Sequence, residues 1–249
     1  MRSFFLAAIT ASLLATAPTL NAQVILSQPI PKEVALALEQ ERQAASLAAQ
    51  GRTAEADALY TQSLAAVERH LPQDPIFAGS LNNVAQFYRG QHRYAEAAEL
   101  FNRALSLYAA AYGDNHTLTA TVINNLGATY LADRQVEAAE QLYRRGLAAT
   151  EKLLGPDHYA VAINLDWLAQ AQFLQRRYPE SEANLRRGIA IAEKSTGPAS
   201  KLVVKLLDHL IAVVQAQGRN QEAAAIQERA QLIITSLRWT DDPAIRVRR

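Results

Sequence analysis

The sequence repeats itself with a period of 42 residues. Residues 80–116 align without a gap with residues 122–158, a further copy begins at Asn164 and another at Leu206. A looser copy over residues 48–71 matches at an offset of 41, which makes five units. A unit of this length is one supersecondary element that cannot bury its apolar face alone, so neighbouring units must stack. The chain is therefore expected to fold as a linear array.

Each unit has the pattern of two helices joined by a short polar turn. The first helix carries apolar residues at the spacing i, i+3, i+4, i+7, which is one face of an amphipathic helix. In the second unit these are Leu81, Val84, Ala85 and Tyr88. The second helix has a small residue, a large one four positions later and a small one three positions after that, so that two helices can pack closely around the large side chain. In the second to fourth units these are Ala97, Phe101, Ala104; Ala139, Tyr143, Gly146; and Ser181, Leu185, Gly188.

Glycines punctuate the array at the same period. Gly113, Gly155 and Gly197 follow the second helix of three successive units, and proline comes directly after the last two of them. Glycine just past the last turn, followed by proline, is a typical helix end.

This pattern resembles the tetratricopeptide repeat, and its 42-residue period, the "LNN" of the first helix and "YAEAAELFNRAL" in the second are most similar to the longer repeats of kinesin light chain and related bacterial proteins. The resemblance implies an all-α, right-handed α-solenoid of about five antiparallel helix pairs. It covers residues 33–238, in units at about 33–74, 75–116, 117–158, 159–200 and 201–238. The outer units depart from the pattern at Gln40, Gln43 and Gln227. We interpret these polar residues as caps, because terminal repeats turn one face to water.

The N-terminus has the layout of a secretory signal peptide. One arginine precedes an uncharged run from Phe4 to Ala17, and the small residue Ala22 marks the expected cleavage site. The alternative is a membrane anchor, although this run is short for a span of about 20 residues. The expected organisation is a signal peptide at 1–22, a linker at 23–32, the solenoid, and a basic tail at 239–249 that is either a frayed end or an anionic contact. The mature protein is then exported, periplasmic or secreted, with no membrane contact after cleavage.

Composition narrows the possible partners. The chain has 25 Lys and Arg against 24 Asp and Glu, which gives no reason to expect nucleic acid. It has no cysteine, so a disulfide framework and a thiolate metal site are both impossible.

No catalytic motif is present in the sequence. The histidines have no metal-ligand spacing, and neither a phosphate-binding loop nor a nucleophile elbow occurs. His116 and His158 stand 42 residues apart and are interpreted as loop or helix-start residues. We therefore expect no enzyme activity, no cofactor and no metal.

The residues next to the apolar stripe of each first helix are the candidates for binding. The resemblance implies that the first helices line the concave side and that asparagines at the positions of Asn83 and Asn125 contact a bound peptide. An amide both donates and accepts hydrogen bonds, so it can pair with any peptide backbone. The full candidate set is Asn83, Asn125, Trp167, His209, Asn82, Asn124, Gln86, Arg89 and Gln170. The alternatives are that Asn82 and Asn124 are solvated, that Asn83 and Asn125 bond to the neighbouring repeat, and that Trp167 belongs to the core.

Two functions follow from this interpretation. The first is an exported, non-catalytic interaction scaffold that holds a peptide or protein segment in its concave groove. The second is a structural subunit of a cell-envelope assembly that uses convex or end surfaces, possibly as a homo-oligomer.

Overall fold

The computed structural model describes residues 30–241, with side chains up to residue 237, and this part of the chain is all α-helix. The helices are α1 (Lys32–Ala49), α2 (Thr53–His70), α3 (Pro75–Gly90), α4 (Tyr94–Tyr112), α5 (Thr117–Ala132), α6 (Val136–Leu154), α7 (Tyr159–Leu174), α8 (Tyr178–Thr196), α9 (Lys201–Ala216) and α10 (Asn220–Asp241). They pack as consecutive pairs, each against the next along the chain. The predicted all-α solenoid of five helix pairs is confirmed for the described residues.

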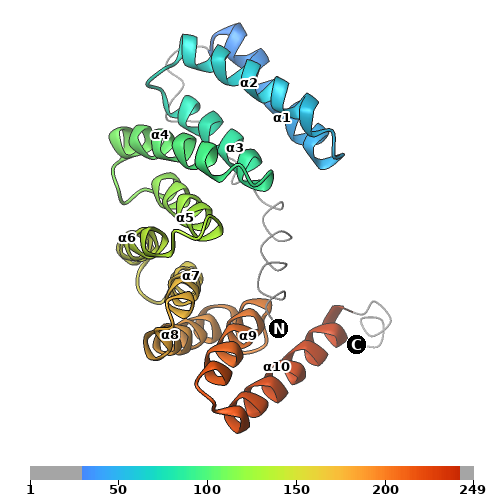
Figure 1. Cartoon of the computed structure of the whole chain (residues 1–249), viewed down its shortest axis with the longest axis vertical. Helices are drawn as coiled ribbons and strands as arrows, with labels where there is room; N and C mark the ends of the chain where they lie inside the picture. The colour runs from blue at the N-terminus through green and yellow to red at the C-terminus, as the bar shows by residue number, and fades with distance from the viewer. Residues whose placement is uncertain (1–29, 242–249) are drawn as a thin grey trace.

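The pairs form an open arc (Figure 1). The first helices of the pairs, α1, α3, α5, α7 and α9, lie on the inner side of the arc, and the second helices lie on the outer side. We call the surface that the five first helices turn toward the centre of the arc the inner face.

Local chemistry fixes where the helices begin and end. Gly113, Gly155 and Gly197 follow α4, α6 and α8 with φ between 80° and 88°, a region that glycine enters without steric cost. The imidazole Nδ1 of His116 accepts a hydrogen bond from the backbone N–H of Leu118 at 3.2 Å, and His158 caps α7 in the same way. The interpretation of these two histidines as helix-start residues is confirmed.

The interior of each pair follows the small–large–small series. Tyr143 is 1 % exposed, and its ring lies so close to Gly127 that a Cβ there would come within 2.7 Å of it. Phe101 and Leu185 fill the same position in the neighbouring pairs and are also buried. In the last pair the large residue is replaced by Gln227, which is exposed. This exposure fits the prediction that the terminal repeats turn polar side chains to water.

Ion pairs join successive outer helices. Glu182 of α8 accepts a hydrogen bond from Arg219 at the start of α10 at 2.6 Å, and Arg177 reaches Glu140 of α6 in the equivalent way at 2.8 Å. Burial alone would raise the pKa of Glu182, but hydrogen bonds from Gln217, Arg219 and Arg186 outweigh it and lower the pKa to about 2. These pairs fix the register of one repeat on the next.

Some predictions concern residues that lie outside the described part of the chain. The signal peptide at 1–22, most of the linker and residues 242–249 of the tail fall outside the described residues, and α10 continues to Asp241, past the expected boundary at 238. Within residues 30–241 none of the helices combines the length and hydropathy needed to cross a membrane.

Candidate functional site

The paired asparagines form hydrogen bonds between neighbouring inner helices. The amide Nδ2 of Asn125 on α5 donates to Oδ1 of Asn82 on α3 at 3.0 Å. One repeat earlier, Nδ2 of Asn83 donates to Oε2 of Glu41 on α1 at 3.3 Å. Glu41 holds the position of Asn82 in its own unit, because that unit is offset by 41 residues. The second residue of each pair therefore reaches back to the first position of the preceding repeat, and Asn82 is bonded rather than simply solvated.

The same contact becomes ionic between the last two pairs. Asp166 of α7 is fully buried, and Nδ1 of His209 on α9 lies 2.5 Å from its Oδ1. Lys205 contacts the other carboxylate oxygen at 3.1 Å, and Gln170 donates to it at 3.2 Å. Burial opposes the ionisation of Asp166, but its hydrogen bond and charge contacts with His209 and its contact with Lys205 prevail and lower the pKa of the carboxyl.

The contact between α5 and α7, the third of the four, breaks this series. Asn124 of α5 is half-buried, and its Oδ1 has no hydrogen-bond partner among the described residues. It lies against Gly146, where a Cβ would approach it to 2.5 Å. The residue opposite on α7 is Trp167, which stacks on Tyr143 with ring centroids 5.9 Å apart and stays half-buried. Trp167 thus packs on the core with part of its ring and leaves the rest at the surface.

The residues that remain exposed or half-buried on the inner face change character along the arc. They repeat at i, i+4, i+7 and i+11 in each first helix, on either side of the Asn83 position. From the second to the fifth unit they are Gly79, Asn83, Gln86, Gly90; Thr121, Asn125, Ala128, Ala132; Ile163, Trp167, Gln170, Leu174; and Lys205, His209, Ala212, Ala216. The inner face therefore carries amide side chains on α3, small side chains on α5, apolar side chains on α7 and basic side chains on α9.

Arg89 is the charged group of this face without an acidic partner in the part of the chain that the structure describes. It lies at the C-terminal end of α3, is half-buried, and has its pKa lowered by burial. The phenols of Tyr143 and Tyr94 are near enough to favour its charged form slightly. Taking a guanidinium out of water without a counter-charge costs free energy, which an anionic or carbonyl group of a ligand would offset.

The predicted site residues did not include Glu41, Asp166 or Lys205. Glu41 contacts Asn83, Asp166 contacts His209, and Lys205 contacts Asp166. The repeat period could have indicated two of them, because Glu41 and Asp166 share a position with Asn82 and Asn124 in the aligned units. Ile163 and Leu174 flank Trp167 at helical spacing and could have been found in the same way.

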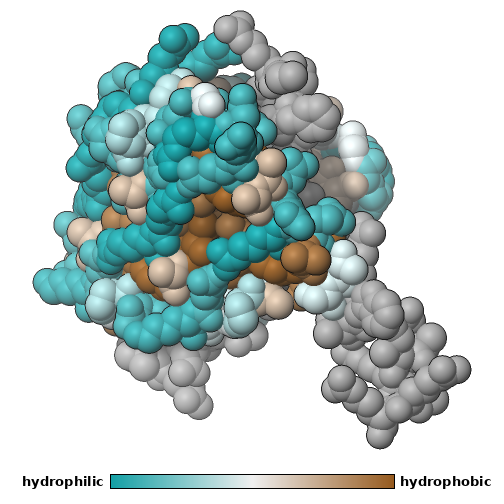
Figure 2. Space-filling view, turned by 90° about the horizontal axis from the view of Figure 1, so that it is seen from below, coloured by the Kyte–Doolittle hydropathy of each residue, from teal (hydrophilic) through white to brown (hydrophobic). Residues whose placement is uncertain are grey.

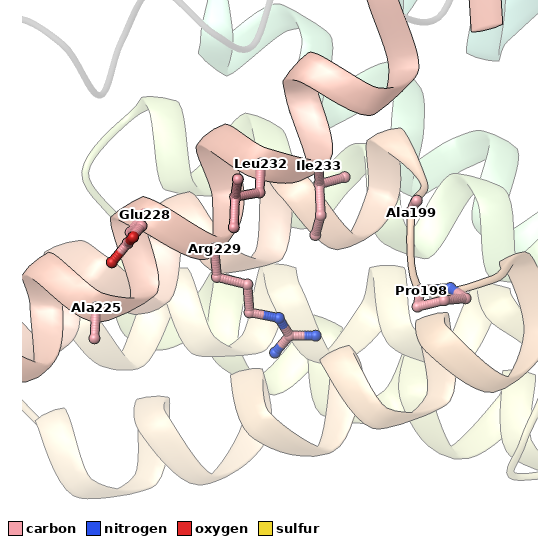
Figure 3. A pocket seen from close by; sticks show the side chains of 7 residues that line it. All are labelled: Pro198, Ala199, Ala225, Glu228, Arg229, Leu232 and Ile233. Carbon is pink, nitrogen blue, oxygen red and sulfur yellow. The ribbon is translucent and has the colours of Figure 1, made fainter. Parts of the chain in front are cut away.

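A second concavity lies away from these residues. A shallow hollow of about 410 Å³ separates α10 from the connection between α8 and α9, with Pro198 on one side and Leu232 and Ile233 on the other (Figure 3). Arg229 points into this region and pairs with Glu193 of α8. Within the described residues no three His, Asp or Glu side chains are placed to hold a metal ion.

Comparison with known proteins agrees with this architecture. The family described as tetratricopeptide repeat matches residues 77–152 and 135–194. None of the curated protein sequences matches this chain.

Solved structures show the same fold. A putative kinesin light chain of Podospora anserina with nearly identical TPR-like repeats superposes with a TM-score of 0.75 at 23% identity, over 84% of this chain and 99% of that one. BtubC (BKLC) from P. vanneervenii gives a TM-score of 0.66 at 24% identity, over 83% and 91% of the two chains. MamA from Desulfovibrio magneticus RS-1 gives 0.61 at 16% identity, over 84% and 98%.

Proposed function

Because the chain belongs to the tetratricopeptide-repeat family, whose members generally serve as non-catalytic scaffolds for protein partners, we propose that it binds an extended peptide segment of a partner protein along its inner face. The observation that carries this proposal is the half-buried guanidinium of Arg89, which has no acidic partner among the described residues, together with the half-exposed ring of Trp167. A free scaffold surface with no ligand gains nothing from either group.

The proposed ligand lies across the first helices. The exposed amides of Asn83 and Gln86 pair with its backbone, and Arg89 receives a carbonyl or carboxylate oxygen. An apolar side chain of the ligand packs on Trp167, Ile163 and Leu174 of α7. The chain reaches this partner after export, in the periplasm or outside the cell, and needs neither cofactor nor catalytic group for the task.

Binding to an array of extended peptides tests this proposal. Replacing Asn125 would break its bond to Asn82, and replacing Asn83 would break its bond to Glu41, so the sharper variants are Arg89→Gln and Gln86→Ala. Each should weaken binding about tenfold or more, the size expected for a buried charged or central contact. Arg69→Gln is the matched control, because Arg69 is an exposed arginine at the end of α2. Retained binding in Arg89→Gln and in Gln86→Ala, with helicity intact, would refute the inner-face assignment.

The alternative is a structural subunit that assembles through its ends. The charged pairs that join internal repeats do not continue across such a junction. Ala224 and Thr235 of α10 occupy the positions of Glu182 and Glu193 in α8, and Gln62 of α2 occupies that of Arg103 in α4. This loss of the charge pattern at both ends favours the peptide-binding scaffold over stacking of the chain into a filament.

A further inference from the structure

The two ends of the solenoid differ in polarity. In internal repeats one side of the first helix is buried against the preceding pair, as Phe77, Ser80, Val84 and Phe87 are in α3. At these positions α1 carries Leu36, Glu39, Gln43 and Ser46, all exposed. Three of the four are polar, so the N-terminal end is suited to water.

The C-terminal end is apolar along α9. Ala162 and Ala169 of α7 are buried in the same apolar cluster as Leu206 and Leu210 of α9. The equivalent residues of α9 are Val204 and Ile211, which are larger and only partly buried. Figure 2 looks at the end of the molecule where α8, α9 and α10 lie, and hydrophobic surface occupies its middle between hydrophilic side chains.

One acidic residue stands between these two apolar side chains. Asp208 occupies the position of Asp166, the residue that receives His209 and Lys205 from the next first helix. Within the described residues no further first helix packs on α9 as α9 packs on α7, and Asp208 is an exposed residue. Partial burial raises the pKa of Asp208, which the neighbouring His209 only partly counteracts.

We propose that this end of the solenoid, formed by Val204, Asp208 and Ile211 of α9 beside α10, docks one amphipathic helix of a partner protein that presents a lysine or histidine to Asp208 between apolar residues one turn away. The site continues the interface by which α9 itself lies on α7, where the same position already receives a histidine and a lysine. Val204 and Ile211 replace alanines, so the docked helix lies farther from α9 than α9 lies from α7.

A second copy of this chain is a poorer occupant. Its α1 would place Arg42 opposite Asp208, but the same face of α1 carries the polar residues Glu39, Gln43 and Ser46. The ion pairs that join successive second helices would also be missing between the two copies. The proposal does not depend on peptide binding at the inner face, which uses other residues.

A labelled, stapled peptide of residues 200–217 is the probe, because this segment is the helix that occupies the equivalent site on α7. Fluorescence anisotropy with the full chain should show saturable binding. Asp208→Lys should weaken it about tenfold or more, as the loss of one partly desolvated charge contact does. A peptide with Glu in place of Lys205 and His209 should bind Asp208→Lys better than it binds the unchanged protein.

Matched variants isolate the site. Glu99→Lys makes the same charge change on an exposed residue of α4, which packs on α3 and α5, and should leave binding unchanged. Arg89→Gln should also bind the probe normally, which separates this site from the inner face. No saturable binding up to about 1 mM, a free energy too small for a specific helix, would overturn the proposal. A dimer in light scattering that Asp208→Lys dissolves would also overturn it, since the occupant would then be a second copy.

Discussion

Glu41 shows how one buried carboxyl sets a pH dependence. It is 5 % exposed, one of its oxygens has no hydrogen-bond partner among the described residues, and burial raises its pKa despite the nearby Ser80 hydroxyl and the hydrogen bond from Asn83. Because the folded-state pKa is raised above the ordinary value of 4.5, the stability linked to Glu41 is complete below that value and is lost as pH rises through the folded pKa.

Glu41→Gln should therefore be more stable than the unchanged protein at pH 7, by about 1 kcal/mol, which is typical for relieving a poorly satisfied buried charge. The difference should disappear near pH 4, where Glu41 is protonated in both states. Urea unfolding across this pH range measures it, and Glu33→Gln, an exposed residue of the same helix, controls for the change in net charge. An advantage that is the same at pH 4 and pH 7 would contradict this explanation.

Gly127 is required by a single close contact. An added Cβ would meet the ring of Tyr143 at 2.7 Å, and that ring is 1 % exposed and held on both sides by the core. Gly127→Ala should destabilise the fold by about 1–3 kcal/mol through overpacking, less the roughly 1 kcal/mol that alanine gains in a helix. Gly90→Ala, at a helical position with open space around it, should leave the free energy of unfolding unchanged or raise it. Urea unfolding of both variants measures the difference. Equal unfolding midpoints for the two variants would show that the ring can move aside.

At the scale of the elements, the two helices of each pair are joined by a short turn, and one residue of that turn has positive φ. Glycine holds this position as Gly51 and Gly218, while His92, Arg134 and Arg176 adopt φ of 61° to 64° there. A side chain with a Cβ pays about 1 kcal/mol in this region.

Arg176→Gly should consequently raise stability by up to about 1 kcal/mol, less the entropy that glycine adds to the unfolded chain. Gly218→Ala is the reverse experiment at the equivalent turn and should lower it. Thermal unfolding of both variants measures the two changes in stability. A stabilising effect of Gly218→Ala would contradict the conclusion that positive φ is strained for a residue with a Cβ at this turn.

At the scale of the whole molecule, stability passes from repeat to repeat through the outer ion pairs. Glu182 joins α8 to α10, and its pKa of about 2 means that its contribution is present above the ordinary value of 4.5 and is lost as pH falls through the folded pKa. Glu182→Gln should cost about 1–2 kcal/mol at pH 7, the range for hydrogen bonds to a charged group, and almost nothing near pH 2. Hydrogen exchange should show the loss first in α9 and α10, because each repeat contacts only its neighbours. A uniform increase in exchange over all ten described helices would refute this local coupling.

The sequence by itself determined the five helix pairs, their caps and the faces that pack, because a 42-residue period repeats the same apolar spacing and the same glycines. It could not decide between the two asparagine positions, since Asn82 and Asn83 both lie off the apolar stripe and differ only by 100° around the helix. Only the tertiary structure shows that one reaches the next repeat and the other the preceding one. Asp166 is likewise buried against His209, a residue 43 positions away, and Arg89 has no acidic partner among the described residues. The spacing within a helix determines which face a side chain lies on, but the adjacent repeat determines which residues that side chain contacts.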